Sequence, residues 1–142
     1  MRFKVIPEVH LVLEQDHRIL LLRRCNTGYM DGHYSLVAGH VDGGETFRAA
    51  MKREAFEEAG VDIAKNDLVL SHMMHRQSGE ERLSLFFTAN NWRGDVRNME
   101  PDKCNDLAWL DKDGLPENTV PYISAGLAHI RNGDVYSEFG WE

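Results

Sequence analysis

A glycine-rich segment that runs directly into a charged helix constrains this chain more than any other feature. Residues 39–45 read Gly-His-Val-Asp-Gly-Gly-Glu, which is too rich in glycine for regular structure and lets the backbone approach a ligand closely. Thr46 is suited to cap the start of a helix and Gly60 to end one, so the sequence predicts a helix over residues 46–59. Exposed backbone amides at the start of such a helix favour anionic groups, including phosphate.

The rest of the chain predicts a mixed order of strands with one further helix. The first two runs of β-forming residues are joined by a short polar turn, which is typical of an antiparallel hairpin. No internal repeat, low-complexity tract or linker interrupts the order, so we expect one domain of the α+β class over residues 1–142. In chain order, the expected elements are strands over 4–13 and 18–24, a loop over 25–33, strands over 34–38, 68–75 and 82–89, a loop over 90–105, a strand over 107–110 and a helix over 121–131.

Composition excludes several classes of function. The 142 residues carry 23 acidic and 16 basic side chains, a formal net charge of −7, whereas broad nucleic-acid binding depends on Lys and Arg replacing phosphate counterions. No apolar run approaches the roughly 20 residues that cross a bilayer. Cys25 and Cys104 are too few for a disulfide framework. We therefore expect a cytoplasmic protein whose partners include neither nucleic acid nor a membrane.

Carboxylates share one face of the expected helix. At about 100° per residue, Glu54, Glu57 and Glu58 fall within an arc of roughly 100°. The apolar side is expected opposite, with Ala49, Phe56 and Ala59. A solvated acidic face is the simplest interpretation, because charge runs are common on exposed helices. The preceding glycine loop favours a second interpretation, since Mg²⁺ binds carboxylate oxygens together with substrate phosphates.

Residues 39–61 read GHVDGGETFRAAMKREAFEEAGV, and this segment resembles the Nudix box, G-x5-E-x7-R-E-U-x-E-E-x-G-U, in which U is a bulky aliphatic residue. If each literal residue occurs by chance at about 7% of positions, the probability that all seven match together is on the order of 10⁻⁸ per starting position. Val61 conforms at the last aliphatic position, whereas Ala55 is smaller than usual. The resemblance, to small MutT-like members, implies the Nudix fold, a mixed β-sheet sandwiched between helices. The filled literal positions are Gly39, Glu45, Arg53, Glu54, Glu57, Glu58 and Gly60.

The resemblance implies a Mg²⁺-dependent pyrophosphohydrolase of nucleotides, with Mn²⁺ as a substitute for Mg²⁺. The implied metal ligands are Gly39, through its carbonyl, Glu54, Glu57 and Glu58. Arg53 is implied to act with Glu54 and Glu57 in catalysis by orienting the helix carboxylates, and Glu45 is implied to pair with Arg53. The general base is open between Glu54 and Glu100, which resembles the loop acid of MutT-like members.

The sequence gives weaker evidence for substrate contacts outside the carboxylate helix than for the metal ligands on it. Arg23 and Arg24 end the second strand near the implied phosphate site, although ordinary strand charges explain them nearly as well. His40 and the Gly39 backbone lie in the glycine loop and are candidate substrate contacts. Asp106 resembles a position that faces the nucleobase in MutT-like members, and an exposed loop acid is the alternative. The histidines lack paired metal-ligand spacing, so no zinc site is expected.

The implied substrates are nucleoside diphosphates linked to another moiety. We expect a nucleoside triphosphate, normal or oxidised, to give the monophosphate and pyrophosphate, because the chain has no extra N-terminal region of the kind frequent in ADP-ribose hydrolases of the family. Hydrolysis of ADP-ribose or of dinucleoside polyphosphates is the alternative. A non-catalytic nucleotide-binding module and a metal-stabilised structural helix are further alternatives. A homodimer is common among relatives, and the sequence leaves the oligomeric state open.

Overall fold

Strand β1 (Ile6–Gln15) is the central element of the computed structural model, which describes all 142 residues. It pairs parallel with β6 (Glu80–Ala89), pairs antiparallel with β4 (Val37–His40), and turns back at its end into β2 (Arg18–Arg24). The remaining elements are β3 (Tyr34–Ser35), α1 (Phe47–Ala59), the short 3₁₀ helix η1 (Lys65–Asp67), β5 (Val69–Ser78), β7 (Cys104–Asp111), α2 (Pro121–Arg131) and β8 (Tyr136–Phe139). The 8-stranded sheet has the order β3-β2-β1-β6-β5-β8, with β4 added to β1 and β7 added to β2.

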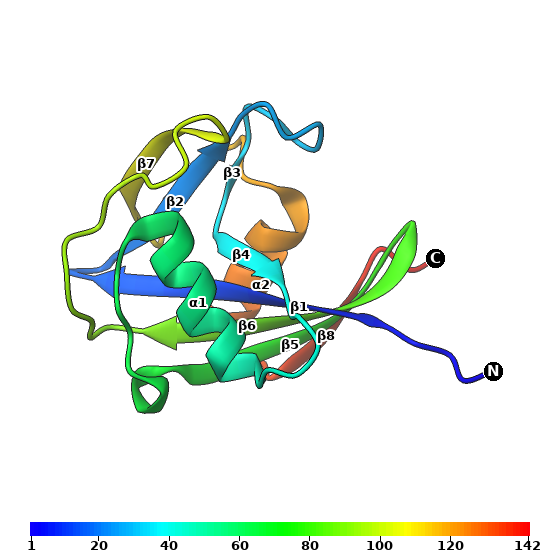
Figure 1. Ribbon diagram of the computed structural model, residues 1–142. Coiled ribbons are helices and arrows are strands. Elements are labelled where there is room, and N and C mark those ends of the chain that lie inside the picture. The colour runs from blue at the N-terminus through cyan, green and yellow to red at the C-terminus, as the bar shows by residue number, and fades with distance from the viewer.

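Helices α1 and α2 cover opposite faces of the sheet (Figure 1). Alternate residues of the central strands belong to two separate cores, one under each helix. Leu11 and Leu13 of β1 pack in the core under α1, and Val12 between them packs in the core under α2. Because successive strand residues point to opposite faces, this division confirms the expected sheet between helices and the α+β class. No helix in the structure has both the length and the apolar character that spanning a bilayer requires.

Several expected elements are confirmed. The first hairpin forms, and its turn places Asp16 and His17 at positive φ. The hairpin is short, however, because β1 and β2 pair only next to the turn and then join different neighbours. The helices expected over 46–59 and 121–131 are α1 and α2, and α1 begins one residue later because Thr46 is its N-cap.

Several of the expected strand boundaries are wrong, because pairing with neighbouring strands decides where each strand begins and ends. The strand expected over 34–38 is divided into β3 and β4, and Gly39 and His40 extend β4 against β1 instead of belonging to a loop. β5 and β6 meet at a tight turn on Gly79, so both are longer than expected. β7 begins at Cys104 because it pairs with the end of β2. β8 has no counterpart among the expected strands, since it is four residues long and is stabilised by parallel pairing with β5.

Candidate functional site

Helix α1 turns part of its acidic face toward the sheet. Thr46 Oγ1 caps the helix by accepting a backbone N–H at 3.1 Å, and Gly60 ends it at a φ of 71°. The expectation of an apolar side opposite the carboxylates holds for Ala59, which is buried, but is wrong for Phe56, which is 56% exposed, because the buried face lies beside the carboxylates. Small side chains on the buried face allow α1 to lie close to β1 and β4. The buried helix residues are Ala50, Met51, Ala55 and Ala59.

Gly39 lies directly against the Glu54 side chain. A Cβ built on Gly39 would come within 2.6 Å of all three carboxyl atoms of Glu54, whereas non-bonded heavy atoms need about 3.5 Å. The Glu54 side chain is 13% exposed and occupies the space that a side chain at position 39 would take. Cβ atoms on Gly43 and Gly44 would meet nothing within 4 Å. Of these three glycines, therefore, only Gly39 is required by close approach to another part of the protein.

Arg53 links the glycine-rich loop to the helix carboxylates. Its Nη2 donates to Glu45 Oε1 at 2.7 Å and its Nε donates to Glu45 Oε2 at 3.2 Å, the two-pronged geometry that suits a guanidinium and a carboxylate. Its Nη1 donates to Glu54 Oε1 at 2.8 Å and to Glu57 Oε2 at 3.4 Å, and Nη2 also reaches the His40 carbonyl at 3.3 Å. The hydrogen bonds from Arg53 and from a backbone N–H lower the pKa of Glu45. The expected pairing of Glu45 with Arg53 is present.

Glu58 lies enclosed between α1 and β4 beside a second carboxyl group. Burial raises the pKa of Glu58 well above its usual value, and the hydrogen bond and negative charge of Glu54 and the charge of Glu100 raise it further. The Ala38 N–H donates to Glu58 and opposes the shift. The protein thus gathers carboxyl groups here, and the nearby cations are Arg53, which donates to Glu54 at 2.8 Å, and Arg24 and Lys103. A divalent cation fits this donor set, because hard carboxylate oxygens are the ligands that Mg²⁺ prefers.

The loop before β7 brings Glu100 to the same place. The Met99 N–H donates to the Glu58 carbonyl at 3.2 Å, which fastens this loop to the last turn of α1. Glu54, Glu58 and Glu100 together line a cavity of 420 Å³. The side chain that sequence reasoning named as a loop acid therefore faces the same space as the helix carboxylates.

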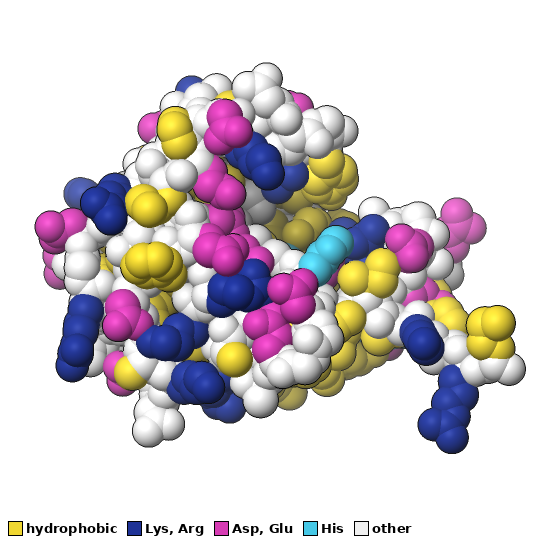
Figure 2. All heavy atoms as spheres, viewed as in Figure 1, with side chains coloured by type: hydrophobic (Ala, Val, Ile, Leu, Met, Phe, Trp, Pro, Cys, Tyr) yellow, Lys and Arg dark blue, Asp and Glu magenta, His cyan; other side chains and the backbone are white.

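A second cavity, of 320 Å³, adjoins the first, and Arg24 and Ala38 line both. Figure 2 shows acidic side chains gathered over α1 beside a hollowed part of the surface. The second cavity is bounded by polar and aromatic side chains from β1, β4, β5, β6 and α2 and from the loop that follows β2. These side chains include Glu8, His10, Tyr29, His40, Arg76, Arg82 and Tyr122.

The candidate substrate residues fall into two groups. Arg24 and His40 line the 320 Å³ cavity, whereas Arg23 and Asp106 line neither cavity. This separation follows from strand geometry, because successive residues of β2 point to opposite faces. The Arg23 guanidinium lies 5.8 Å from the centre of the Tyr34 ring, and the Tyr34 hydroxyl donates to Asp106. A contact between Asp106 and a nucleobase stays a prediction.

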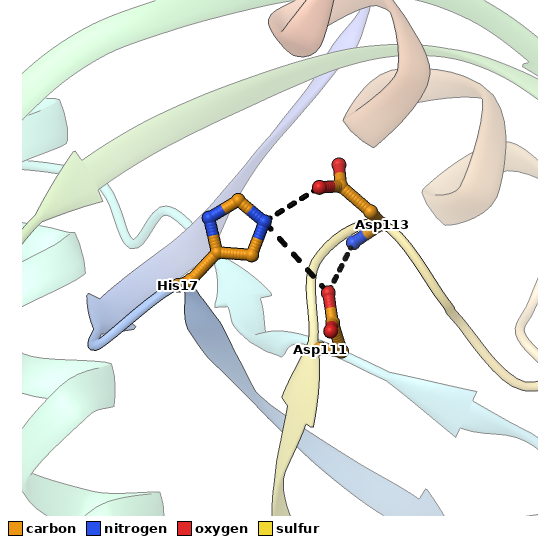
Figure 3. Close-up of side chains that lie close together, drawn as sticks. All are labelled: His17, Asp111 and Asp113. Carbon is orange, nitrogen blue, oxygen red and sulfur yellow. Dashed lines mark hydrogen bonds and ion pairs between the residues drawn. The ribbon is translucent and has the colours of Figure 1, made fainter.

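One further group of potential metal ligands lies at the other end of β2 (Figure 3). His17 Nε2 lies 2.5 Å from Asp113 Oδ2 and 3.9 Å from Asp111 Oδ1, and all three side chains are more than half exposed. β2 spans the seven residues from Arg18 to Arg24, or about 20 Å at about 3.3 Å per residue. The group is therefore remote from the carboxylate cavity, and ordinary exposed ion pairs account for it.

The sequence indicated Arg24 and His40 but not the other polar residues that line the 320 Å³ cavity. A signal was present for Glu8 and His10, which are two residues apart in an otherwise apolar strand and so share one face. Both are buried, and such groups need partners. No local pattern identifies Arg76 or Arg82, because their partner comes from β1, far away in the chain.

Comparisons with curated proteins place the chain among hydrolases of one family. The model of the NUDIX domain matches residues 6–128. NAD-capped RNA hydrolases NudC from Chromobacterium violaceum and Shigella dysenteriae are 30% and 28% identical to this chain over 129 and 118 residues. These matches cover 91% and 83% of this chain and 46% and 44% of the relatives, so the chain spans less than half of their length.

Solved structures give the same result. The MutT NUDIX hydrolase from Burkholderia pseudomallei has a TM-score of 0.81 at 26% identity, and the match covers 89% of this chain and 98% of that one. The MutT protein from Methanosarcina mazei has a TM-score of 0.77 at 18% identity, with 93% and 96% covered, which shows a shared fold. The mixed sheet with α1 and α2 on its two faces is the fold of these structures.

Proposed function

This chain belongs to the Nudix family of hydrolases, and on that premise we propose that it cleaves the diphosphate bridge of a nucleotide with Mg²⁺ or Mn²⁺. The observation that carries the proposal is the meeting of Glu54, Glu58 and Glu100 in one cavity beside the Gly39 backbone. These carboxylates repel a bare diphosphate, so a substrate of that charge needs cations between it and the protein. The arrangement therefore supports metal-assisted phosphate chemistry over binding of the free anion.

The residues that we propose to hold the metal come from α1 and the end of β4. They are Glu54, Glu57, Glu58 and the Gly39 carbonyl. A divalent metal bound there neutralises the diphosphate and orients its oxygens. Arg53 acts on the ligands and not on the substrate, because its Nη1 fixes Glu54 and Glu57 while its other donors are occupied by Glu45.

Glu100 is the residue that we propose to take the proton from the attacking water. Glu54 Oε1 already accepts from Arg53 at 2.8 Å, and Glu58 is assigned to the metal. The Glu100 carboxylate makes no hydrogen bond or ion pair to another residue and faces the same cavity. Glu100→Gln should lower kcat by at least about 10² with unchanged Mn²⁺ affinity. Glu54→Gln should weaken Mn²⁺ binding as well, and a reversed pattern would assign the base to Glu54.

The nucleoside part of the substrate is proposed to occupy the 320 Å³ cavity, which offers aromatic rings and hydrogen-bonding groups next to the carboxylates. A nucleoside triphosphate, cleaved to monophosphate and pyrophosphate, is the first substrate to test. The relatives named as NAD-capped RNA hydrolases favour a second candidate, a dinucleotide of the NAD type. The net charge of −7 argues against a long RNA partner.

A substrate panel tests the proposed function directly. We would measure hydrolysis of GTP, an oxidised guanine triphosphate, ADP-ribose, a diadenosine polyphosphate, NADH and a short NAD-capped RNA in Mg²⁺, and identify the products by phosphorus NMR. Preferred cleavage of a triphosphate supports the first candidate, and preferred cleavage of NADH supports the second. Absence of cleavage across the panel, in a protein that still binds Mn²⁺, would overturn the assignment as a nucleotide pyrophosphohydrolase.

A further inference from the structure

Two arginines share one glutamate on the wall of the 320 Å³ cavity that is formed by β1, β5 and β6. Arg76 Nη2 donates to Glu8 Oε1 at 2.7 Å, and Arg82 Nη1 donates to Glu8 Oε2 at 2.8 Å. Arg76 and Arg82 are direct cross-strand partners, a placement in which like charges destabilise a sheet. All three residues line the cavity. We call them the arginine pair and its glutamate.

The arginine pair carries more positive charge than the acids that line the cavity balance. One carboxylate serves both guanidinium groups, and the only other acid near them is the exposed Glu80, 3.8 Å from Arg82 Nη2. His40 Nε2 lies 3.1 Å from the same Glu8 carboxylate and adds no negative charge. The neighbouring Arg24 bonds only to a carbonyl and a hydroxyl. The cavity wall is therefore cationic, beside a cavity whose lining is acidic.

Arg76 is held rigidly with donors to spare. Its side chain is 6% exposed, its guanidinium lies 3.7 Å from the centre of the Tyr122 ring, and its Nε donates to Ser84 Oγ at 3.4 Å. Tyr122 is fixed in turn, since its hydroxyl lies 2.9 Å from His10 Nε2. The Arg76 Nη1 group donates no hydrogen bond within the protein. Nη1 is also not among the buried side-chain atoms that lack a partner, so on this cavity-lining residue it is open to solvent and free to donate to a bound acceptor.

We propose that the arginine pair binds a second anionic group of the nucleotide, a phosphate carried by the ribose. Along β4, β1, β6 and β5, Arg82 and Arg76 stand two and three strand spacings from Gly39 and are displaced from it by three residues along the strands, so their backbones lie about 14 and 17 Å from that of Gly39. The arginine pair thus lies at the end of the cavity away from the α1 carboxylates, where a phosphate other than the cleaved diphosphate would sit; this orientation of the nucleotide rests on the proposed function. Two guanidinium groups match the several oxygens of a phosphate. The substrate class is therefore a nucleoside diphosphate derivative with a ribose phosphate.

Equilibrium binding tests the inference without hydrolysis. Calorimetry in Mg²⁺ would compare adenosine 5′-monophosphate with adenosine 2′,5′-bisphosphate and adenosine 3′,5′-bisphosphate. We expect at least one bisphosphate to bind about tenfold or more tightly than the monophosphate. Arg82→Gln should remove most of this preference, because it should lower the affinity for the bisphosphate far more than the affinity for the monophosphate. Arg18→Gln, which alters an exposed arginine at the start of β2, is the matched control and should keep the preference.

The outcomes separate this inference from the proposed function. Equal affinities in the wild type, or a preference that survives both Arg82→Gln and Arg76→Gln, would overturn it. A changed preference for guanine over adenine monophosphates, with no phosphate preference, would also overturn it and assign the wall to the base. If Arg76→Gln does not fold, Arg82→Gln still decides, because that side chain is 21% exposed. Phosphate-dependent binding without hydrolysis of any nucleotide would refute the proposed function and retain the anion site.

Discussion

Replacing Gly39 with alanine perturbs the proposed metal site through a single methyl group. Gly39 does not have a positive φ, so its backbone accepts alanine without strain. The added Cβ would lie within 2.6 Å of the three carboxyl atoms of Glu54. Because van der Waals contact needs about 3.5 Å, the Glu54 carboxylate has to retreat by about 1 Å or more.

The expected loss of activity follows from this displacement. Mg²⁺ holds its oxygen ligands at about 2.0–2.1 Å and tolerates little distortion, so a retreat of about 1 Å takes Glu54 out of the coordination shell. Misplacement of this size costs about 10² in rate, or about 3 kcal/mol of transition-state stabilisation. We therefore expect kcat/KM to fall about 10²-fold, together with weaker Mn²⁺ binding and little change in the midpoint of thermal unfolding.

Gly43→Ala is the matched control for this substitution. Gly43 also lacks a positive φ, and its added Cβ would meet nothing within 4 Å. Steady-state hydrolysis of the best substrate from the panel, at limiting and at saturating Mg²⁺, would be measured for both variants alongside thermal unfolding. If the two variants hydrolyse substrate and bind Mn²⁺ equally well, then Glu54 is not a ligand and the reasoning from Gly39 is refuted.

Three further predictions concern the carboxylates, their arginine and a buried histidine. Glu57→Gln and Glu58→Gln should each lower turnover by at least about 10² with an unchanged circular dichroism spectrum, and wild-type rates in both would remove the metal assignment. Arg53→Lys keeps the charge but loses the fork that joins Glu45 to the helix, so kcat should fall about 10- to 100-fold, and equal rates would contradict a positioning role. Burial lowers the pKa of His10 from 6.5 to about 4. The native state therefore takes up this proton only at a lower pH than the unfolded state does. The free energy of unfolding should fall by up to about 3 kcal/mol as the pH drops from 6.5 to 4. Urea unfolding should show a flatter pH dependence in His10→Gln, and an unchanged slope would disprove the assignment.

The helix between Thr46 and Gly60 was predictable because its determinants are local. A capping threonine, a terminal glycine and side chains at helical spacing define α1 without reference to the rest of the chain. The direction in which α1 buries itself was not predictable from the same pattern. It depends on how closely small side chains such as Ala55 allow the helix to approach the sheet, and this contact left Phe56 outside.

Features that depend on pairing between distant strands could not be derived from local patterns. Glu8 meets Arg76 and Arg82 only because β1 is inserted beside β6, which a hairpin-based prediction does not indicate. β8 follows the same rule, since only its pairing with β5 makes its four residues a strand. Glu100 was found from its resemblance to a family position, whereas its approach to Glu58 depends on the hydrogen bonds of its own loop to α1.

The most direct measurement of the central claim is the anomalous diffraction of Mn²⁺ in crystals soaked with Mn²⁺ and a nucleotide product. We predict a peak bounded by Glu54, Glu57, Glu58 and the Gly39 carbonyl, with phosphate oxygens of the nucleotide beside it. A peak only at the exposed group of His17, Asp111 and Asp113, with the α1 carboxylates free of metal, would contradict it.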